Sequence, residues 1–255
     1  MNFFWSCCLG FLFGVSAFAQ GEEKREPIDA RGIIQKMNEH MRGTTAYMEF
    51  TMKVVRPRYT REIGLKTWAK GEDFHLIYVT SPRRDEGTAY LKRGNEVWSW
   101  LPTIERLMKL PPSMMGQSWM GSDFTNDQLV RESSIVEDYD HQILREEKVG
   151  ERNCYVIEMT PHEGVAVIWG RVIVWVDKTL FVQMKGEHYD ERNRLINTVS
   201  FSEIKSLGGR EIPTKVELTP KDKPDQKTIL IYENARFEIE LEPSFFSIQN
   251  LRSVR

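Results

Sequence analysis

A dozen segments of this chain alternate apolar with polar residues, and this repeat of two constrains the fold more than any other feature. In residues 46–54, Met48, Phe50, Met52 and Val54 are separated by more polar residues, as in a strand with one face in water. Similar runs occupy residues 63–69, 74–79, 88–93, 96–101, 104–110, 155–160, 172–176, 180–184, 195–204, 212–218 and 228–232.

The connections between these segments predict antiparallel neighbours. Gly71, Gly94, Gly150 and Gly208 each stand in a short polar turn between two apolar runs. A dozen such strands would form a large antiparallel sheet, curved or closed so that few edges stay open. Because no linker rich in Pro, Gly or Ser divides the chain, we expect residues 20–255 to form one domain.

Helices are few and are expected to cover one face of this sheet. The first is predicted over residues 29–43, with Asp29 as N-cap and Gly43 as the C-terminal stop. Its apolar stripe is formed by Ile33, Ile34, Met37 and Met41. Another helical region is expected after Pro243. Its apolar cluster consists of Phe245, Phe246, Ile248 and Leu251.

A second helical region is predicted over residues 111–130. It begins with two prolines, after which Ser113 is expected to cap a short turn. Thr125 and Gln128 have the spacing of a capping box, and this predicts a further short helix through Val130.

The N-terminus has the character of an export signal. Residues 3–19 form an uncharged apolar run that ends in Ala17-Phe18-Ala19, a small-x-small cleavage signature. We interpret residues 1–19 as a secretory signal peptide cleaved near Ala19; an uncleaved membrane anchor is the alternative, because only the α-amino group supplies positive charge before the run. Cleavage would leave Cys154 alone, which excludes an internal disulfide and predicts a buried, unreactive thiol.

The charges and motifs exclude several classes of function. The 35 basic and 37 acidic residues are interspersed, which argues against nucleic acid as the principal partner. The sequence contains no HExxH pair, no glycine-rich phosphate loop and no GxSxG elbow. His162 and His188 are interpreted as polar turn residues, and Asp123, Asn126 and Asp127 as helix caps and not calcium ligands. We therefore expect no catalytic residues, no metal and no cofactor, although a hydrolytic site assembled from distant residues stays open.

Residues 97–124 concentrate large, adaptable apolar side chains. The cluster consists of Trp98, Trp100, Met108, Met114, Met115, Trp119, Met120 and Phe124. Rigid Trp faces and flexible Met side chains suit a surface that accepts varied apolar ligands, and the same residues also suit a solid core. Strand parity places Trp98 and Trp100 together on one face, so they are predicted to form a rigid cavity wall. Met114, Met115, Trp119 and Met120 are predicted to form a movable lid.

Short motifs occur together along nearly the whole of this chain. They are Ser81-Pro82, residues 87–91, Trp98-Ser99-Trp100-Leu101-Pro102, residues 120–127, Trp175-Val176-Asp177-Lys178, residues 209–213, Phe245 and Leu251. In combination they resemble the LolA-like family of outer membrane lipoprotein-sorting proteins, in a distant branch marked by the Gly-Ser-Asp-Phe segment at residues 121–124.

This resemblance implies a fold and a function. The expected fold is mainly antiparallel β with few α-helices: a half-open curved β-barrel covered by a helical lid. The expected protein is a periplasmic, non-catalytic carrier that takes acylated lipoprotein or other lipid cargo from the inner membrane toward the outer membrane. Expected partners are the cargo, an inner-membrane ABC transporter permease and, transiently, a membrane. Two alternatives remain, a sensor that docks a membrane-protein partner and a secreted hydrolase.

Overall fold

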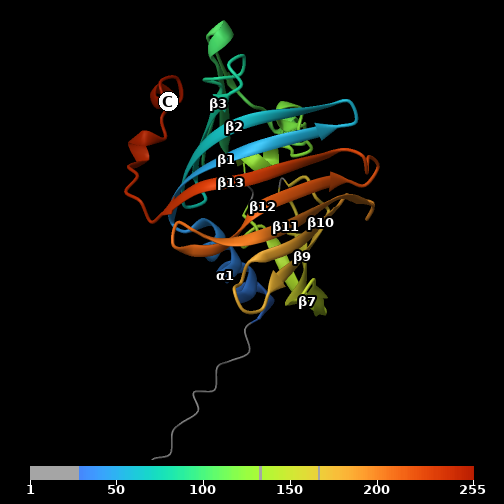
Figure 1. Cartoon of the computed structure of the whole chain (residues 1–255). Helices are drawn as coiled ribbons and strands as arrows, with labels where there is room; N and C mark the ends of the chain where they lie inside the picture. The colour runs from blue at the N-terminus through green and yellow to red at the C-terminus, as the bar shows by residue number, and fades with distance from the viewer. Residues whose placement is uncertain (1–28, 132–133, 166) are drawn as a thin grey trace, which may run out of the picture.

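The computed structural model describes residues 29–131, 134–165 and 167–255, in which the chain forms a 13-stranded antiparallel sheet with few helices (Figure 1). The strands are β1 (Thr45–Arg56), β2 (Tyr59–Lys70), β3 (Phe74–Ser81), β4 (Ala89–Arg93), β5 (Glu96–Leu101), β6 (Arg106–Lys109), β7 (Tyr139–Val149), β8 (Arg152–Pro161), β9 (Arg171–Asp177), β10 (Gln183–Tyr189), β11 (Leu195–Leu207), β12 (Arg210–Pro220) and β13 (Lys227–Phe237). The predicted signal peptide, residues 1–19, lies outside the described residues.

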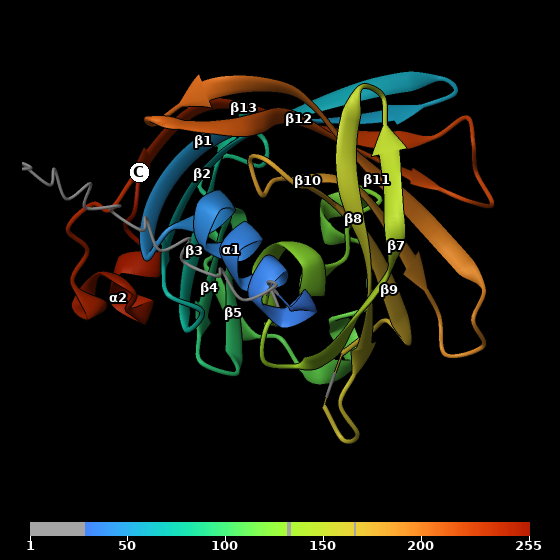
Figure 2. The ribbon, with the colours of Figure 1, turned by 90° about the horizontal axis from the view of Figure 1, so that it is seen from below.

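The sheet is one long meander with a single break in chain order. Its spatial order is β6-β5-β4-β3-β2-β1-β13-β12-β11-β10-β9-β8-β7, so every neighbouring pair except β1 and β13 is consecutive in the chain. The sheet curves strongly, and β6 and β7 are its two edges, which are not paired with each other (Figure 2). This open, curved antiparallel sheet confirms the predicted fold class.

One predicted strand was wrong, and one strand was not predicted. Residues 180–184 were predicted as a strand, but β10 begins at Gln183 and the chain turns around Asp177, whose Oδ1 accepts hydrogen bonds from the backbone N–H groups of Thr179 and Leu180 at 2.8 and 2.7 Å. Strand β7 was not predicted, because most of its side chains are exposed, several of them charged, and they give no apolar alternation. It is an edge strand that pairs with β8 alone.

Helix α1 (Ala30–Arg42) confirms the first predicted helix. The Asp29 carboxylate caps it by accepting a 2.7 Å hydrogen bond from Gly32 N, and Gly43 ends it with a φ of 67°. The helix lies on the concave side of the curved sheet (Figure 2), and Ile33 and Ile34 of its apolar stripe are fully buried against the inner face of β8 and β9. Among the described residues, no helix has the length and apolar character needed to cross a bilayer.

The C-terminal segment packs on the opposite, outer face of the sheet. After β13 the chain forms a 3-10 turn (Pro243–Phe245) and one turn of helix, α2 (Ile248–Leu251). Phe246 and Leu251, at 0% and 1% exposure, anchor the segment against β3 and β4. The predicted apolar cluster after Pro243 is therefore a strap over the outer face.

Cys154 is buried, as the sequence predicted. Cys154 is fully buried in β8 and is a free thiol. Burial, with Asp177 nearby, raises the pKa of this thiol to about 11. A thiol that stays protonated at neutral pH is a poor nucleophile, so Cys154 acts as core filler.

Candidate functional site

The connection from β6 to β7 passes under the curved sheet and covers its concave face. We name residues 111–131 the lid segment; it contains 3-10 turns at Pro112–Met114 and Trp119–Gly121 and one π-helical turn at Asp127–Arg131. The predicted capping box is confirmed, because Gln128 N donates to Thr125 Oγ1 at 3.2 Å and Thr125 N donates to Gln128 Oε1 at 3.1 Å. The predicted Ser113 cap was wrong, since Pro111 occupies the N-cap and no side chain caps that turn.

The Gly-Ser-Asp-Phe segment pins the lid segment to the sheet. Asp123 Oδ2 lies 3.0 Å from Arg56 Nη1 of β1, and Thr228 Oγ1 of β13 donates to the same carboxylate oxygen at 2.7 Å. The Gly121 carbonyl accepts a second bond from Arg56 at 2.9 Å. The side chains of Arg56 and Asp123 are 13% and 8% exposed, so this ion pair is largely removed from water. Asp123 therefore fixes where the lid segment sits.

Six of the eight predicted site residues lie together beneath the sheet. They share one apolar cluster with side chains of β1, β2, β3, β12 and β13. These residues are Met108, Met114, Met115, Trp119, Met120 and Phe124. Trp119 is fully buried and packs on Tyr90 with ring centroids 5.5 Å apart. Of the six, Trp119 and Phe124 line the two interior cavities described below.

The other two predicted residues, Trp98 and Trp100, lie on the outer face. They pack with the cluster of the C-terminal strap, and Arg252 lies over the Trp100 ring at 5.5 Å. The prediction that Trp98 and Trp100 form a cavity wall was wrong, because the register of β5 and β6 turns them to the face opposite Met108. Met108 pairs with Ser99, whereas Lys109 pairs with Trp98, and cross-strand partners face the same side. Val97 and Ser99 are therefore the inward-facing residues of β5.

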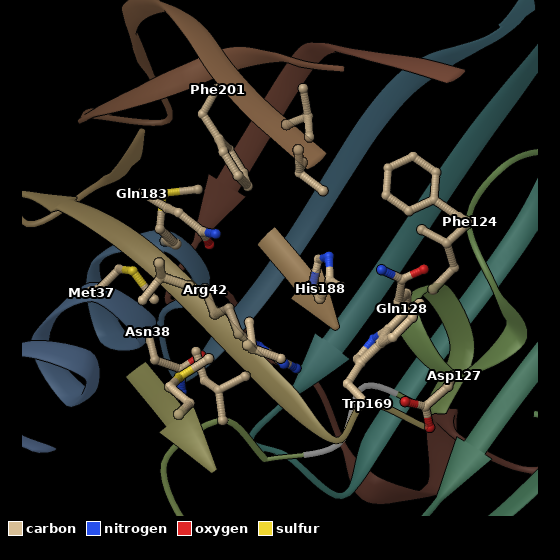
Figure 3. Close-up of a pocket in the computed structure, with 18 of the residues that line it drawn as sticks. Met37, Asn38, Arg42, Phe124, Asp127, Gln128, Trp169, Gln183, His188 and Phe201 are labelled. Carbon is tan, nitrogen blue, oxygen red and sulfur yellow. The ribbon is translucent and has the colours of Figure 1, made fainter. Parts of the chain in front are cut away.

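The first interior cavity lies between α1, the lid segment and the inner face of β9 to β13 (Figure 3). Its volume is about 310 Å³, within the range of about 300–1,000 Å³ for small-molecule sites. The sheet side is mainly aliphatic and is formed by Val172, Val174, Val199, Val216 and Leu230. The opposite side is formed by Met37 of α1, Phe124 of the lid segment and Trp169 of the loop before β9.

The second cavity continues the first toward β1, β2 and β3. Its volume is about 160 Å³, and Phe50, Leu65, Ile77 and Trp119 form much of its apolar lining. Five residues border both cavities: Met41, Arg42, Leu129, Leu230 and Tyr232. The concave side of the sheet therefore holds two adjoining, mainly apolar cavities that have these five lining residues in common.

Sequence reasoning missed the polar residues of the first cavity, above all His188. This residue was predicted in a turn, but it lies within β10 beside Val172 of β9 and Asn197 of β11. Its Nδ1 is 2.6 Å from Asn197 Oδ1, and its ring packs on Trp169 with centroids 4.9 Å apart. Burial lowers the pKa of His188 to about 4, against a smaller opposing effect of the Asn197 bond. The imidazole is therefore neutral at pH 7, with its proton on Nδ1.

Comparison with known proteins identified one family model and several similar structures. The family model, described as "Uncharacterized protein", matches residues 71–253, which is more than two thirds of the chain. A search of curated proteins returned no match.

Three solved structures have the same fold over nearly their whole length. A DUF1329 family protein from Desulfovibrio piger is 25% identical, with a TM-score of 0.79 over 87% of this chain and 97% of that one. A domain named for outer membrane lipoprotein sorting, from Vibrio parahaemolyticus, is 22% identical, with a TM-score of 0.78 over 88% and 98%. A LolA superfamily protein from Nitrosomonas europaea is 21% identical, with a TM-score of 0.76 over 88% and 100%.

Proposed function

Because this chain belongs to the family of uncharacterized proteins whose model matches residues 71–253, and because it shares its fold with a lipoprotein-sorting domain and a LolA superfamily protein, we propose that it is a carrier for acyl chains. The single observation that carries the proposal is the pair of adjoining apolar cavities between the concave face of the sheet, α1 and the lid segment. In this proposal the acyl chain of a lipoprotein or another lipid occupies these cavities.

The energy of burial supports a carrier of this kind. Each buried methylene contributes about 0.8 kcal/mol, so a chain of about twelve methylenes gains about 10 kcal/mol before the costs of ordering. That gain keeps a chain out of water during transfer. Release then requires that the lid segment separate from the sheet, to which the Arg56–Asp123 pair and the buried side chains of Trp119 and Phe124 hold it.

The finer features of the proposal come from the resemblance in the sequence. The carrier would act in the periplasm, without catalysis, and would receive its cargo at the inner membrane from an ABC transporter permease. It would move the cargo toward the outer membrane and contact the membranes transiently. The sheet, the lid segment and the balanced surface charge are compatible with this role.

Quenching by lipids tests the proposal against the positions of the tryptophans. We expect 9,10-dibromostearic acid to quench the fluorescence of the wild-type protein, because Trp119 and Trp169 line the cavities. Trp169→Phe should lose part of this quenching. Trp98→Phe is the matched control and should retain it, because Trp98 lies on the outer face.

A second measurement identifies natural cargo. Native mass spectrometry and lipid extraction of the protein purified from its own cell envelope should recover an acylated ligand. Absence of any acylated ligand, together with no quenching by the brominated acid, would contradict the proposed function. Equal losses of quenching in Trp98→Phe and Trp169→Phe would place the ligand outside the cavities.

A further inference from the structure

Strand β10 carries polar side chains into the concave wall beside the valines of β9. The inward-facing positions of β10 are Gln183, Gly186 and His188, which pair with Val176, Val174 and Val172 of β9. On the other side, Gly186 pairs with Val199 of β11. Gln183 and His188 both line the first cavity. Polar side chains beside the valines of β9 are costly inside an apolar space unless their polar atoms find partners.

Gly186, which has no side chain, leaves space between the side chains of Gln183 and His188. A Cβ atom at this position would lie 2.8 Å from Gln183 Nε2, 3.9 Å from Val199 Cβ and 4.0 Å from His188 Cε1. A larger residue would therefore fill the space between the carboxamide and the imidazole. In Figure 3, His188 stands in the middle of the cavity, between Gln183 and Arg42 on one side and Gln128 and Phe124 on the other.

The hydrogen bond to Asn197 leaves one atom of the His188 ring for a ligand. Nδ1 donates to Asn197 Oδ1, and Asn197 is itself only 4% exposed. Within the described residues this is the one hydrogen bond of the ring, whose other close contact is the Trp169 indole. The neutral ring thus carries an unprotonated Nε2, which accepts a hydrogen bond and cannot donate one.

We propose that the cargo carries a neutral hydrogen-bond donor next to its acyl chain, an amide N–H or a hydroxyl, and that His188 Nε2 accepts it inside the first cavity. The proposal rests on the carrier function and specifies its ligand class. We take the donor to be neutral because neither sheet partner of His188, Val172 on β9 or Asn197 on β11, carries a charge that would pair with a cation at Nε2. The low pKa of His188 keeps the acceptor present throughout the neutral range.

Matched ligands test the proposal on the full chain. N-propyl dodecanamide and propyl dodecanoate differ only in an N–H or an oxygen beside the carbonyl group. 3-Hydroxydodecanoic and dodecanoic acid form the pair for a hydroxyl donor. In at least one of these two pairs, we expect the wild-type protein to bind the ligand that has the donor about tenfold more tightly than the ligand that lacks it, as measured by isothermal titration calorimetry.

The His188→Phe variant should abolish this preference, because phenylalanine keeps an aromatic ring on Trp169 but removes the acceptor. Affinity for the ligand without the donor should stay within about twofold. His162→Phe, which removes an imidazole that is 40% exposed, is the matched control and should keep the preference.

The outcomes separate this proposal from the carrier function. If all four ligands bind and neither pair shows a preference, the donor proposal is overturned and the carrier function stands. If no ligand binds, both are overturned. Should His188→Phe fail to fold, ¹⁵N spectra of the wild-type imidazole decide. The proposal requires a neutral Nδ1–H tautomer whose Nε2 signal moves when the donor ligand binds, and an Nε2–H tautomer would overturn it.

Discussion

The partly buried imidazole of His188 makes the stability of the protein depend on pH in a defined window. Its pKa is lowered from the ordinary value of 6.5 to about 4 in the folded chain. Between these two values the unfolded chain holds a proton on His188 that the folded chain lacks. By linkage, the free energy of unfolding therefore falls as pH falls from about 6.5 to about 4, and this contribution is fully present above 6.5.

The size of the effect follows from the pKa difference. A difference of about 2.5 pKa units at about 1.36 kcal/mol per unit gives about 3 kcal/mol. Other groups also titrate in this range, so a variant is needed to isolate His188. His188→Gln keeps a polar side chain on the inner face of β10 and removes the titration.

Urea unfolding at pH 7.0, 5.5 and 4.5 measures this contribution. The stability of the wild-type protein should fall more steeply than that of His188→Gln, and the difference between the two should change by roughly 2–3 kcal/mol across the range. His162→Gln serves as the control for loss of an exposed imidazole and should follow the wild-type curve. Parallel curves for the wild-type protein and His188→Gln would refute the reasoning.

Three substitutions test other contacts in the fold. Asp123→Ala leaves the largely buried Arg56 unpaired and should cost about 3–5 kcal/mol of stability in urea, and a loss below about 1 kcal/mol would show that the pair does not hold the lid segment. Phe246→Ala should cost about 3–5 kcal/mol by removing the anchor of the outer strap, with acyl-chain affinity unchanged in titration calorimetry. Gly170→Ala would put a Cβ 2.8 Å from Asp190 O, so we expect a loss of about 1–3 kcal/mol and weaker quenching of Trp169 by brominated lipid; unchanged quenching would show that Gly170 does not position that indole.

Local chemistry allowed much of this fold to be predicted. Asp29, Gly43 and the Thr125–Gln128 pair act on backbone groups only a few residues away in the chain. The helix ends that they form can therefore be recognised from sequence spacing alone. Alternation predicted most strands because one face of each is buried. Alternation did not predict β7, because this strand is held in the sheet by backbone pairing with β8 and not by burial of its side chains.

The site was harder to predict because both faces of β5 are covered. The lid segment packs against the inner face at Val97, and the C-terminal strap packs against the outer face at Trp98 and Trp100. Hydrophobicity therefore could not tell which face lines the cavity, and only the pairing of β5 with β6 decides it. His188 was missed for the opposite reason, since a polar residue in a strand is ordinarily interpreted as solvent-facing.

The single break in strand order has a consequence for the route by which the chain folds. Strands β1 to β6 and β7 to β13 can each form from hairpins between chain neighbours, which close short loops at low entropic cost. The β1–β13 pairing, which joins Ala46 to Phe237, brings together segments from nearly opposite ends of the described chain. We expect this seam to form late and to limit the folding rate, so mutations along it should slow folding more than mutations in the outer hairpins.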